Sequence, residues 1–274
     1  MALVIQTNTA ALAAQKNLQA NQKALAGSFQ KLSSGFRVNS AADDAAGLAV
    51  SESMKSQIRS YTVAERNASD GISMAETAEG ALNEVHDTLG RMRELAMQAS
   101  NGSLSSTDRG YLNTEFTALK NEITRIQGSA KFNGTKLVGT AGTSVKFQVG
   151  LNNSASDQIT LTFGGVALTT LVAGTTAVSS ATSALNALGR IDTAIGSVST
   201  ARAKFGTAMN RLEVASSNIQ TMRLNLSAAN SRIRDVDVAQ ETSKMSRNQV
   251  LSQAGVSVLA QANQLPQMAF GLLG

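Results

Sequence analysis

The residues best suited to chemistry stand in one stretch, SSGFRVNSAADDAAGLAVSE at positions 33–52, which contains the adjacent carboxylates Asp43 and Asp44. Paired carboxylates can bind a divalent cation or share general acid and base roles. Neighbouring side chains on a helix point about 100° apart, however, so these two cannot hold one ion together. Ser40, three residues before Asp43, has capping-box spacing, which puts both acids in a first helical turn where the helix dipole favours negative charge. The stretch therefore predicts a joint that begins a helix, and no metal site.

Catalytic residues are scarce in the rest of the chain. His86 is the one histidine and cysteine is absent, so an H-E-x-x-H zinc site, a thiolate metal site and a disulfide are excluded. A Ser-His-Asp triad could be built only around His86. We find no nucleophile–base pair, phosphate-binding loop or metal cluster. We therefore predict that the protein is not an enzyme and needs no cofactor.

Composition and charge also limit the partners. A formal net charge of +5 and a pI of about 9.7 would permit nucleic-acid binding, but the chain has no Lys/Arg-rich run and only 4% aromatic residues. No apolar run reaches membrane-spanning length, and no basic segment precedes a short apolar run as in a cleavable signal peptide. We therefore expect no nucleic acid, no membrane insertion and no cleaved leader.

Long helices are the elements that would position the joint. Apolar residues recur every seven positions from 184 to 236 in two interleaved series, and all sixteen positions are apolar. This heptad pattern predicts a coiled-coil helix, and the alanines of the second series predict close helix packing. The same pattern runs through most of residues 43–99. The two series are Ala184, Ile191, Val198, Phe205, Leu212, Ile219, Leu226 and Ile233, and Ala187, Ala194, Ala201, Ala208, Ala215, Met222, Ala229 and Val236.

A shorter helix and a hairpin are predicted between the two heptad segments. Residues 105–127 open with the capping-box spacing of Ser105 and Asp108 and continue as one apolar stripe. The segments SVKFQVG and QITLTF alternate apolar and polar residues, which predicts a β-hairpin over about 143–164. The Thr/Ser/Gly-rich tract from 164 to 183 is predicted to be a surface excursion. The fold class is thus mainly α, with a helical coiled-coil domain and a three-rod helical domain that carries the small β-hairpin.

The lengths of the predicted helices bring the two ends of the chain together. As helices, residues 43–99 span about 85 Å and residues 184–236 about 80 Å, so the chain returns to its starting end. Residue 43 should therefore lie near residue 236. We expect ion pairs across the joint, each of small energy because such pairs are exposed. The expected pairs join Arg37 to Asp235 or Asp237, and Asp43 or Asp44 to Arg232 or Arg234.

The two terminal segments have an unusual charge pattern. Residues 1–42 contain four positive side chains and no acid, and residues 248–274 contain no charged side chain. Both are helix-patterned, and two such helices side by side would bury one apolar stripe each and leave a face of Gln, Asn, Ser and Ala. Such a face suits packing against many copies of the same chain. The stripes are Leu18, Leu25, Phe29, Leu32 and Phe36 in the first segment, and Leu251, Ala254, Val258, Ala262, Leu265, Ala269 and Leu272 in the second.

The pattern by itself leaves other interpretations open. A two-helix appendage on a coiled-coil adaptor would also explain the termini. A membrane-surface helix pair is disfavoured, because the polar face lacks the dense lysines of such helices. A chemoreceptor-like coiled coil would explain the heptads but neither the hairpin nor the uncharged tails.

Several segments, taken in order along the chain, closely resemble the successive signatures of bacterial flagellin, the subunit of the flagellar filament. The similar regions cover nearly the whole chain except about 138–183, and their combination is highly specific. The segments are LSSGFRVNSAADDAAGLAVSE (32–52), GRMRELAMQASNG (90–102), KFNGTKL (131–137), FQVG (147–150), SRIRDVDVAQE (231–241) and VLSQAGVSVLAQANQLPQ (250–267).

The resemblance implies two domains and a structural role. Residues 1–42 with 235–274 would form a discontinuous inner coiled-coil assembly domain, and residues 43–234 a surrounding rod domain. The chain would self-assemble into the extracellular flagellar filament that drives motility. About 45 residues stand where larger members insert outer domains, so the chain resembles a short, core-only version.

The resemblance also implies partners. Flagellins are exported unfolded through the flagellar type III apparatus, and a cytoplasmic chaperone holds the C-terminal helix, here about 235–274. Cap and hook-junction proteins contact the growing filament. In many flagellins the segment matching RMRELAMQ is bound by a Toll-like receptor. The matching positions here are Arg91, Leu95 and Glu115, although Gly90 departs from the glutamine frequent at its position. By periodicity alone, Leu95 flanks the heptad seam and the two charges lie on solvated helix faces.

A flagellin-like hook–filament junction protein is the nearest rival interpretation. Such proteins resemble flagellin at the N-terminus but usually diverge through the last signature. That signature, residues 250–267, is intact in this chain.

Overall fold

The computed structural model describes residues 7–166, 168, 171 and 176–271. By packing, the chain forms two compact units, Met1–Ser56 with Asn225–Gly274, and Gln57–Leu224. We call them the terminal unit and the rod unit. The long helices α2 (Ala45–Ala99) and α5 (Ala181–Arg234) supply residues to both units.

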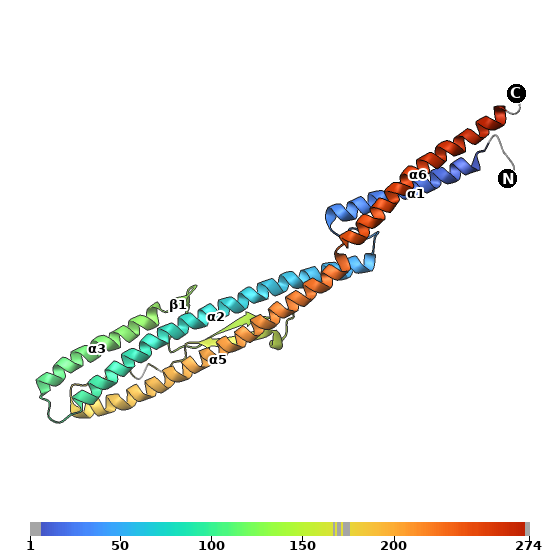
Figure 1. Ribbon diagram of the computed structural model, residues 1–274. Helices are drawn as coiled ribbons and strands as arrows, with labels where there is room; N and C mark the ends of the chain where they lie inside the picture. Colours follow the sequence, from blue (N-terminus) through green and yellow to red (C-terminus); the bar gives the residue numbers. More distant parts are fainter. Residues whose placement is uncertain (1–6, 167, 169–170, 172–175, 272–274) are drawn as a thin grey trace. The chain divides into compact units, whose positions relative to one another are not determined.

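The terminal unit is built on two helices that lie side by side, α1 (Thr9–Ser34) and α6 (Val238–Gly271) (Figure 1). The pair is antiparallel, because Asn8 bonds to Ala262 at one end and Ser28 to Glu241 at the other. The side chain of Asn8 also accepts a hydrogen bond from the Ala11 amide and so caps α1. At the other end α1 stops at Gly35, whose φ of 73° is a left-handed conformation that glycine adopts without strain.

In the rod unit, α3 (Ser106–Ser129) lies beside α2, and α2 lies beside α5 (Figure 1). The predicted helices at 43–99, 105–127 and 184–236 are confirmed, with ends that differ by at most three residues. The predicted capping box of α3 is also present: Ser105 Oγ accepts from the Asp108 amide at 3.2 Å, and Asp108 Oδ2 accepts from the Ser105 amide at 3.2 Å. Most heptad positions are buried in one continuous core, while Met222 is exposed.

Three ion pairs join α2 to α5 along the rod unit. Glu65 pairs with Arg223 at 2.7 Å and Glu79 with Arg202 at 2.6 Å. Farther along, the signs are reversed, because Arg93 of α2 pairs with Asp192 of α5 at 2.8 Å. A heptad seam rich in alanine repeats itself, so these pairs help to distinguish the correct register from one shifted by whole heptads.

The predicted hairpin consists of β3 (Thr143–Gln148) and β4 (Gln158–Phe163), which are antiparallel with Phe147 opposite Ile159. A one-turn helix η1 (Ala155–Asp157) lies between them. Phe147 explains a glycine in the heptad seam of α2, because a Cβ on Gly71 would lie 3.1 Å from the Phe147 ring. A second, very short antiparallel pair, β1 (Lys131–Phe132) and β2 (Thr135–Lys136), was not predicted.

The tract after the hairpin differs from the prediction. A surface excursion was expected from 164 to 183, but four of its described side chains are buried in the rod core: Val166, Leu168, Leu171 and Val178. The backbone of Val178 also donates to the Asn113 side chain of α3 at 3.0 Å. The prediction was wrong for these residues because scattered apolar side chains in a polar tract carry no periodic signal.

Candidate functional site

The joint predicted for residues 33–52 lies inside the terminal unit, where the chain passes from α1 to α2. Phe36 and Asp235 form an antiparallel bridge. The Arg37 amide donates to the Arg234 carbonyl at 2.6 Å, and the Val236 amide donates to the Gly35 carbonyl at 3.0 Å. These backbone contacts confirm the expected meeting of the residue-43 and residue-236 regions.

The side-chain pairing at this joint differs from the prediction for Arg37. Its Nη2 donates to the carbonyls of Ile233 at 2.7 Å and Arg232 at 3.3 Å, and among the described residues no carboxylate lies within ion-pair distance of it. The last carbonyls of α5 have no helical partner and carry the negative end of the helix dipole. These carbonyls therefore accept the hydrogen bonds of the Arg37 guanidinium, which was expected to pair with Asp235 or Asp237.

The carboxylates of Asp43 and Asp44 bond locally instead of pairing with late arginines. Asp43 Oδ2 accepts hydrogen bonds from the amide and hydroxyl of Ser40, at 2.9 and 3.0 Å, and from the Asn39 amide at 3.2 Å. These bonds lower the pKa of Asp43, with the Ser40 amide as the largest cause. Asp44 Oδ1 accepts from the Gly47 amide at 2.9 Å and so caps α2. The prediction that Ser40 caps the helix and that both acids lie in its first turn was therefore wrong, because α2 begins only at Ala45 and its first turn contains no acid.

Arg234 is the residue that holds the joint together. Its guanidinium lies 4.5 Å from the centre of the Phe36 ring, and its Nη1 is 2.5 Å from Glu52 Oε1. Its side chain is only 15% exposed. Glu52 was not among the predicted joint residues, although it lies within the quoted stretch. The side chain of Arg232 is exposed, and this residue contributes to the joint through its backbone carbonyl, which accepts from Arg37. Asp237 caps α6 by accepting from the Gln240 amide at 3.1 Å.

Among the described side chains of the stripe predicted for the last helix, only Ala262 is buried against α1. Leu251 is 44% exposed and Val258 is 54% exposed, whereas the side of α6 toward α1 carries Glu241, Gly255 and Ala262. A Cβ on Gly255 would lie 3.3 Å from Leu18 Cδ1, so small residues are what permit this close approach. Leu265 lies in α6 with a side chain that is not described, and Leu272 lies outside the described residues.

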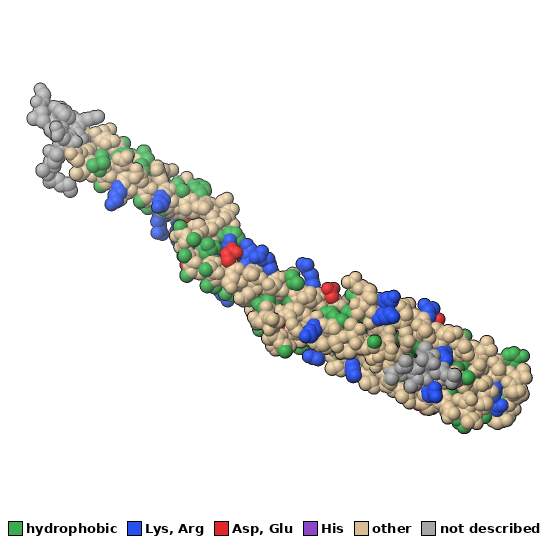
Figure 2. Space-filling view, turned by 180° about the vertical axis from the view of Figure 1, so that it is seen from behind, with side chains coloured by type: hydrophobic (Ala, Val, Ile, Leu, Met, Phe, Trp, Pro, Cys, Tyr) green, Lys and Arg blue, Asp and Glu red, His purple; other side chains and the backbone are tan. Residues whose placement is uncertain are grey.

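The first helix follows its prediction more closely. Leu18, Leu25 and Leu32 are half-buried on the side toward α6, and Phe36 lies under Arg234. Phe29, by contrast, is exposed. The terminal pair therefore leaves large apolar side chains at its surface, and apolar patches are visible along it in Figure 2. These exposed side chains are Leu12 and Phe29 of α1 and Val238, Val250, Leu251, Val256 and Val258 of α6.

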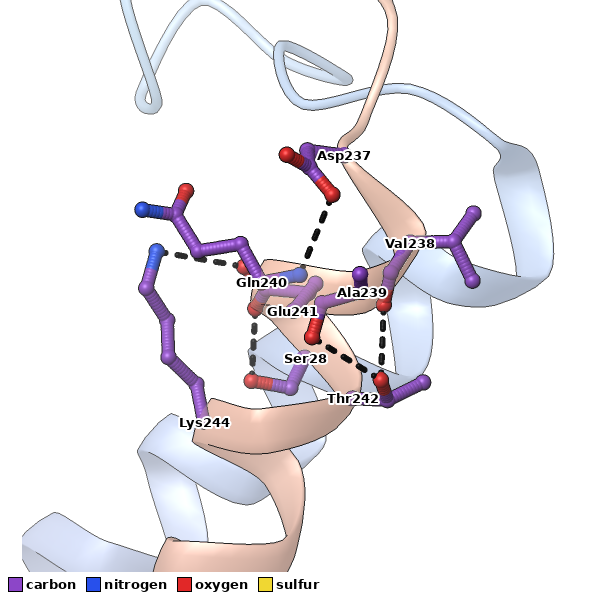
Figure 3. A network of polar contacts seen from close by, with 8 residues as sticks. All are labelled: Ser28, Asp237, Val238, Ala239, Gln240, Glu241, Thr242 and Lys244. Atoms are coloured by element: carbon purple, nitrogen blue, oxygen red, sulfur yellow. Dashed lines mark hydrogen bonds and ion pairs between the residues drawn. The ribbon is translucent and has the colours of Figure 1, made fainter.

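One charged group is buried between the terminal helices. Glu241 is 7% exposed, and Ser28 Oγ of α1 donates to its Oε1 at 2.7 Å (Figure 3). Lys244, one turn later, has its Nζ 3.4 Å from the other carboxylate oxygen. The Ser28 hydrogen bond is the largest cause that lowers the pKa of Glu241, and Lys244 and Lys31 add to it. Sequence analysis missed this network, although Glu241, Asn248, Gly255 and Ala262 share one heptad position.

The three positions of the expected receptor contact lie in the rod unit. Arg91 of α2 bonds to Glu115 of α3 at 2.9 Å, and both side chains are about half exposed. Arg91 also pairs with Glu94 at 2.8 Å. Leu95 is 1% exposed and belongs to the core, so a partner cannot touch it while this packing holds.

The described residues also limit two other kinds of site. No cluster of three or more acidic or histidine side chains suited to a metal ion occurs among the described residues. None of the helices in the described part of the chain combines the length and apolar content needed to cross a membrane.

Two family models match the chain. The bacterial flagellin N-terminal helical region matches residues 5–143, and the bacterial flagellin C-terminal helical region matches residues 188–273. The chain belongs to the bacterial flagellin family. Its relatives include the flagellin of Halalkalibacterium halodurans, 42% identical across 99% of this chain and 100% of that protein. Another is the flagellin of Bacillus subtilis, 41% identical across 98% of this flagellin and 99% of that protein.

One solved structure agrees with this assignment, and a second shows a similar fold. The crystal structure of Bacillus cereus flagellin is 34% identical, with a TM-score of 0.50 over 60% of this flagellin and 94% of that chain. A putative flagellar hook-associated protein from Vibrio parahaemolyticus has a TM-score of 0.56 at 17% identity, over 70% of this chain and 100% of that one, which shows likeness of fold.

Family membership fixes the general role. This flagellin is a structural subunit that polymerises with copies of itself into the extracellular flagellar filament, and it is not an enzyme. It is a short, core-only member, because only residues 164–180 separate the hairpin from α5.

Proposed function

We propose that this flagellin enters its filament through the terminal helices α1 and α6, which together with their flanks form an assembly domain of residues 1–42 and 235–274. Residues 43–234 are then the rod domain that surrounds it, and the joint around Arg234 fixes the passage between the two. This division differs from the packing units because it follows the expected role of each segment in the polymer.

The observation that carries this proposal is the poor burial of the terminal pair. Of its large apolar side chains, Val250, Val256 and Val258 of α6 and Leu12 and Phe29 of α1 remain exposed. No charged side chain follows Arg247, so nothing repels close packing of many copies there. Several large apolar side chains exposed on one helix pair favour a surface that another molecule covers. In a homopolymer, that molecule is another copy.

Export as an unfolded chain is the second part of the proposal. The chain has no cysteine and a single proline, so neither disulfide formation nor repeated prolyl isomerisation delays folding after passage. A chaperone that holds residues 235–274 before export would cover the apolar side chains of α6. The filament cap and hook-junction proteins are then the partners that meet the chain at the growing tip and at the base.

The innate-immune contact is a third, separate proposal. The exposed pair Arg91 and Glu115 presents one cation and one anion on adjacent helices, which suits a receptor surface of complementary charge. The buried Leu95 would act by holding α2 and α3 in place rather than by touching the receptor. A Toll-like receptor reporter assay on Arg91→Ala and on Leu95→Ala, each checked for folding, separates the two roles.

The decisive experiment for assembly compares three chains. The purified intact chain is mixed with filament seeds and imaged by electron microscopy beside a chain that lacks residues 248–274. The third chain replaces Val250, Val256 and Val258 by serine. We expect long filaments from the intact chain, none from the truncation, and a strongly raised critical concentration for the serine variant.

A matched control replaces exposed valines of the rod unit, Val63 and Val214, by serine. If this control is impaired as much as the α6 variant, general surface polarity rather than the terminal pair governs assembly. If the intact chain stays monomeric under every condition, a junction-protein or adaptor role replaces that of the main filament subunit.

A further inference from the structure

A groove runs along α5 beside strand β4 of the rod unit. Its lining combines small, apolar and hydroxyl-bearing side chains with two cations and no acid, and its polar side chains include Thr160, Thr162, Thr200, Lys204, Thr207 and Arg211. Lys204 and Arg211 are exposed, and neither forms an ion pair with any described residue. They are seven residues apart, about 10 Å along the helix. The groove is therefore suited to a surface that carries carboxylates at a similar spacing.

The outer side of α2 offers such a surface within the same unit. From Asn67 to Gly90 the helix contains no lysine or arginine. Glu76, Glu84 and Asp87 are exposed and point into one sector of about 80°, roughly opposite the core positions of the helix. None of these three acids forms an ion pair with a described residue. Glu76 and Glu84 are eight residues apart, about 12 Å along the helix.

Charge is thus separated on the rod unit into a cationic groove and an acidic helix face, each left unneutralised by its own chain. On the face drawn in Figure 2, Lys and Arg side chains stand out along the rod and few Asp or Glu side chains are visible. Complementary patches of this kind select partners and orient them, and like charges brought together cost several kcal/mol.

We propose that the groove beside β4, with Lys204 and Arg211, receives the acidic face of α2, with Glu76 and Glu84, from a second copy of this chain. The inference rests on the proposed assembly function and adds to it a specific contact between rod units. The contact is heterologous, because a groove meets a different surface on its neighbour, and such contacts propagate into open helical polymers when the rotation does not close a ring. The charges would fix which faces meet, while the terminal helices supply apolar burial.

Charge reversal tests the pairing directly. A groove variant carries Lys204→Glu and Arg211→Glu, a face variant carries Glu76→Lys and Glu84→Lys, and a combined variant carries all four changes. The critical concentration for seeded polymerisation is measured for each, at low and at high salt. We expect each two-site variant to raise it at least about tenfold at low salt, and the combined variant to return to within a few-fold of the original chain.

Folding and net charge are controlled separately. All four positions are exposed, so the thermal unfolding of the monomeric variants should match that of the original chain. A control with Lys131→Glu and Lys136→Glu makes the same change in net charge on the β1–β2 hairpin. It should polymerise with nearly the original critical concentration. If it is impaired as strongly as the groove variant, net charge alone explains the effect and the proposed pairing is rejected.

The remaining outcomes separate this inference from the proposed function. If the groove variant loses assembly but the face variant does not, or the combined variant is not rescued, the partner of the groove is not the acidic face of α2. If all charge variants polymerise normally while the chain lacking 248–274 does not, the terminal helices remain the assembly device and only this contact is refuted. Failure of the original chain to polymerise would refute both the proposed assembly function and this contact.

Discussion

At the scale of single residues, Glu241 has the least ordinary environment in the terminal unit. A carboxylate buried to this degree is costly unless it is paired and hydrogen-bonded. Ser28 and Lys244 provide that compensation from α1 and from the next turn of α6. Because the Ser28 bond can form only at one alignment of α1 and α6, the group specifies register as well as stability.

Replacement of Glu241 by glutamine should weaken the terminal pair in a pH-dependent way. The pKa of Glu241 is lowered from 4.5, so its stabilisation is fully present above about pH 4.5 and is lost as pH falls through the lower folded-state pKa. We expect the variant to lose about 1–2 kcal/mol near pH 7 and to converge with the original chain under acid conditions. Circular dichroism melting of both chains from pH 7 to pH 3 measures the difference.

Glu213→Gln is the matched control, because Glu213 is an exposed residue of α5. Its melting temperature should equal that of the original chain at every pH. A constant difference between Glu241→Gln and the original chain across the whole range would show that shape rather than ionisation is what Glu241 supplies.

At the scale of elements, the alanine series of α5 sets the distance between rods. Ala187 and Ala194 are fully buried, so a larger side chain there must push a neighbouring helix outward. Close approach of backbones is stable only while such positions stay small.

Ala194→Leu should therefore destabilise the rod unit by about 1–3 kcal/mol through overpacking. Ala203→Leu places the same side chain on the same helix at an exposed position and should change stability by less than about 0.5 kcal/mol. Chemical denaturation of the two variants gives the comparison. Equal destabilisation by both would mean that helix propensity, not packing against α2, decides the result.

At the scale of the whole molecule, burial is unevenly divided between the two packing units. The continuous apolar core, from Ala64 to Ile219, belongs to the rod unit. Among described residues of the terminal unit, the buried side chains are Ser28, Val38, Ser51, Glu241 and Ala262, of which two are apolar. The free energy of local unfolding should therefore be larger for the rod unit than for the terminal unit.

Limited trypsin digestion of the monomer should therefore remove the terminal segments first. Lys16, Lys23 and Lys31 of α1 and Lys244 and Arg247 of α6 provide cleavage sites. Mass spectrometry should then show a resistant fragment that contains most of residues 57–224, although that region has its own lysines and arginines. Early cleavage inside that region would contradict the expected order of stability.

The sequence predicted much of the fold because its signals were periodic. The heptads located α2 and α5, Ser105 with Asp108 located the start of α3, and alternation located the hairpin. Prediction failed where a single contact competed with others of similar energy. Arg37 donates to the helix-end carbonyls of Ile233 and Arg232 and does not pair with Asp235 or Asp237. No pattern in the sequence indicates which of these acceptors the guanidinium would bind.

By itself, then, the sequence determined the mainly helical class, the family and the absence of charged side chains from residues 248–274, since these depend on composition, spacing and segments that lie together in the chain. The tertiary structure decided which side of α6 faces α1. Gly255 and Glu241 face inward and Val258 faces outward, because the fit to Leu18 and Ser28 is settled only when the two helices meet. Helical spacing identifies a stripe of residues, but the shape and charge of the neighbouring helix determine which stripe is buried.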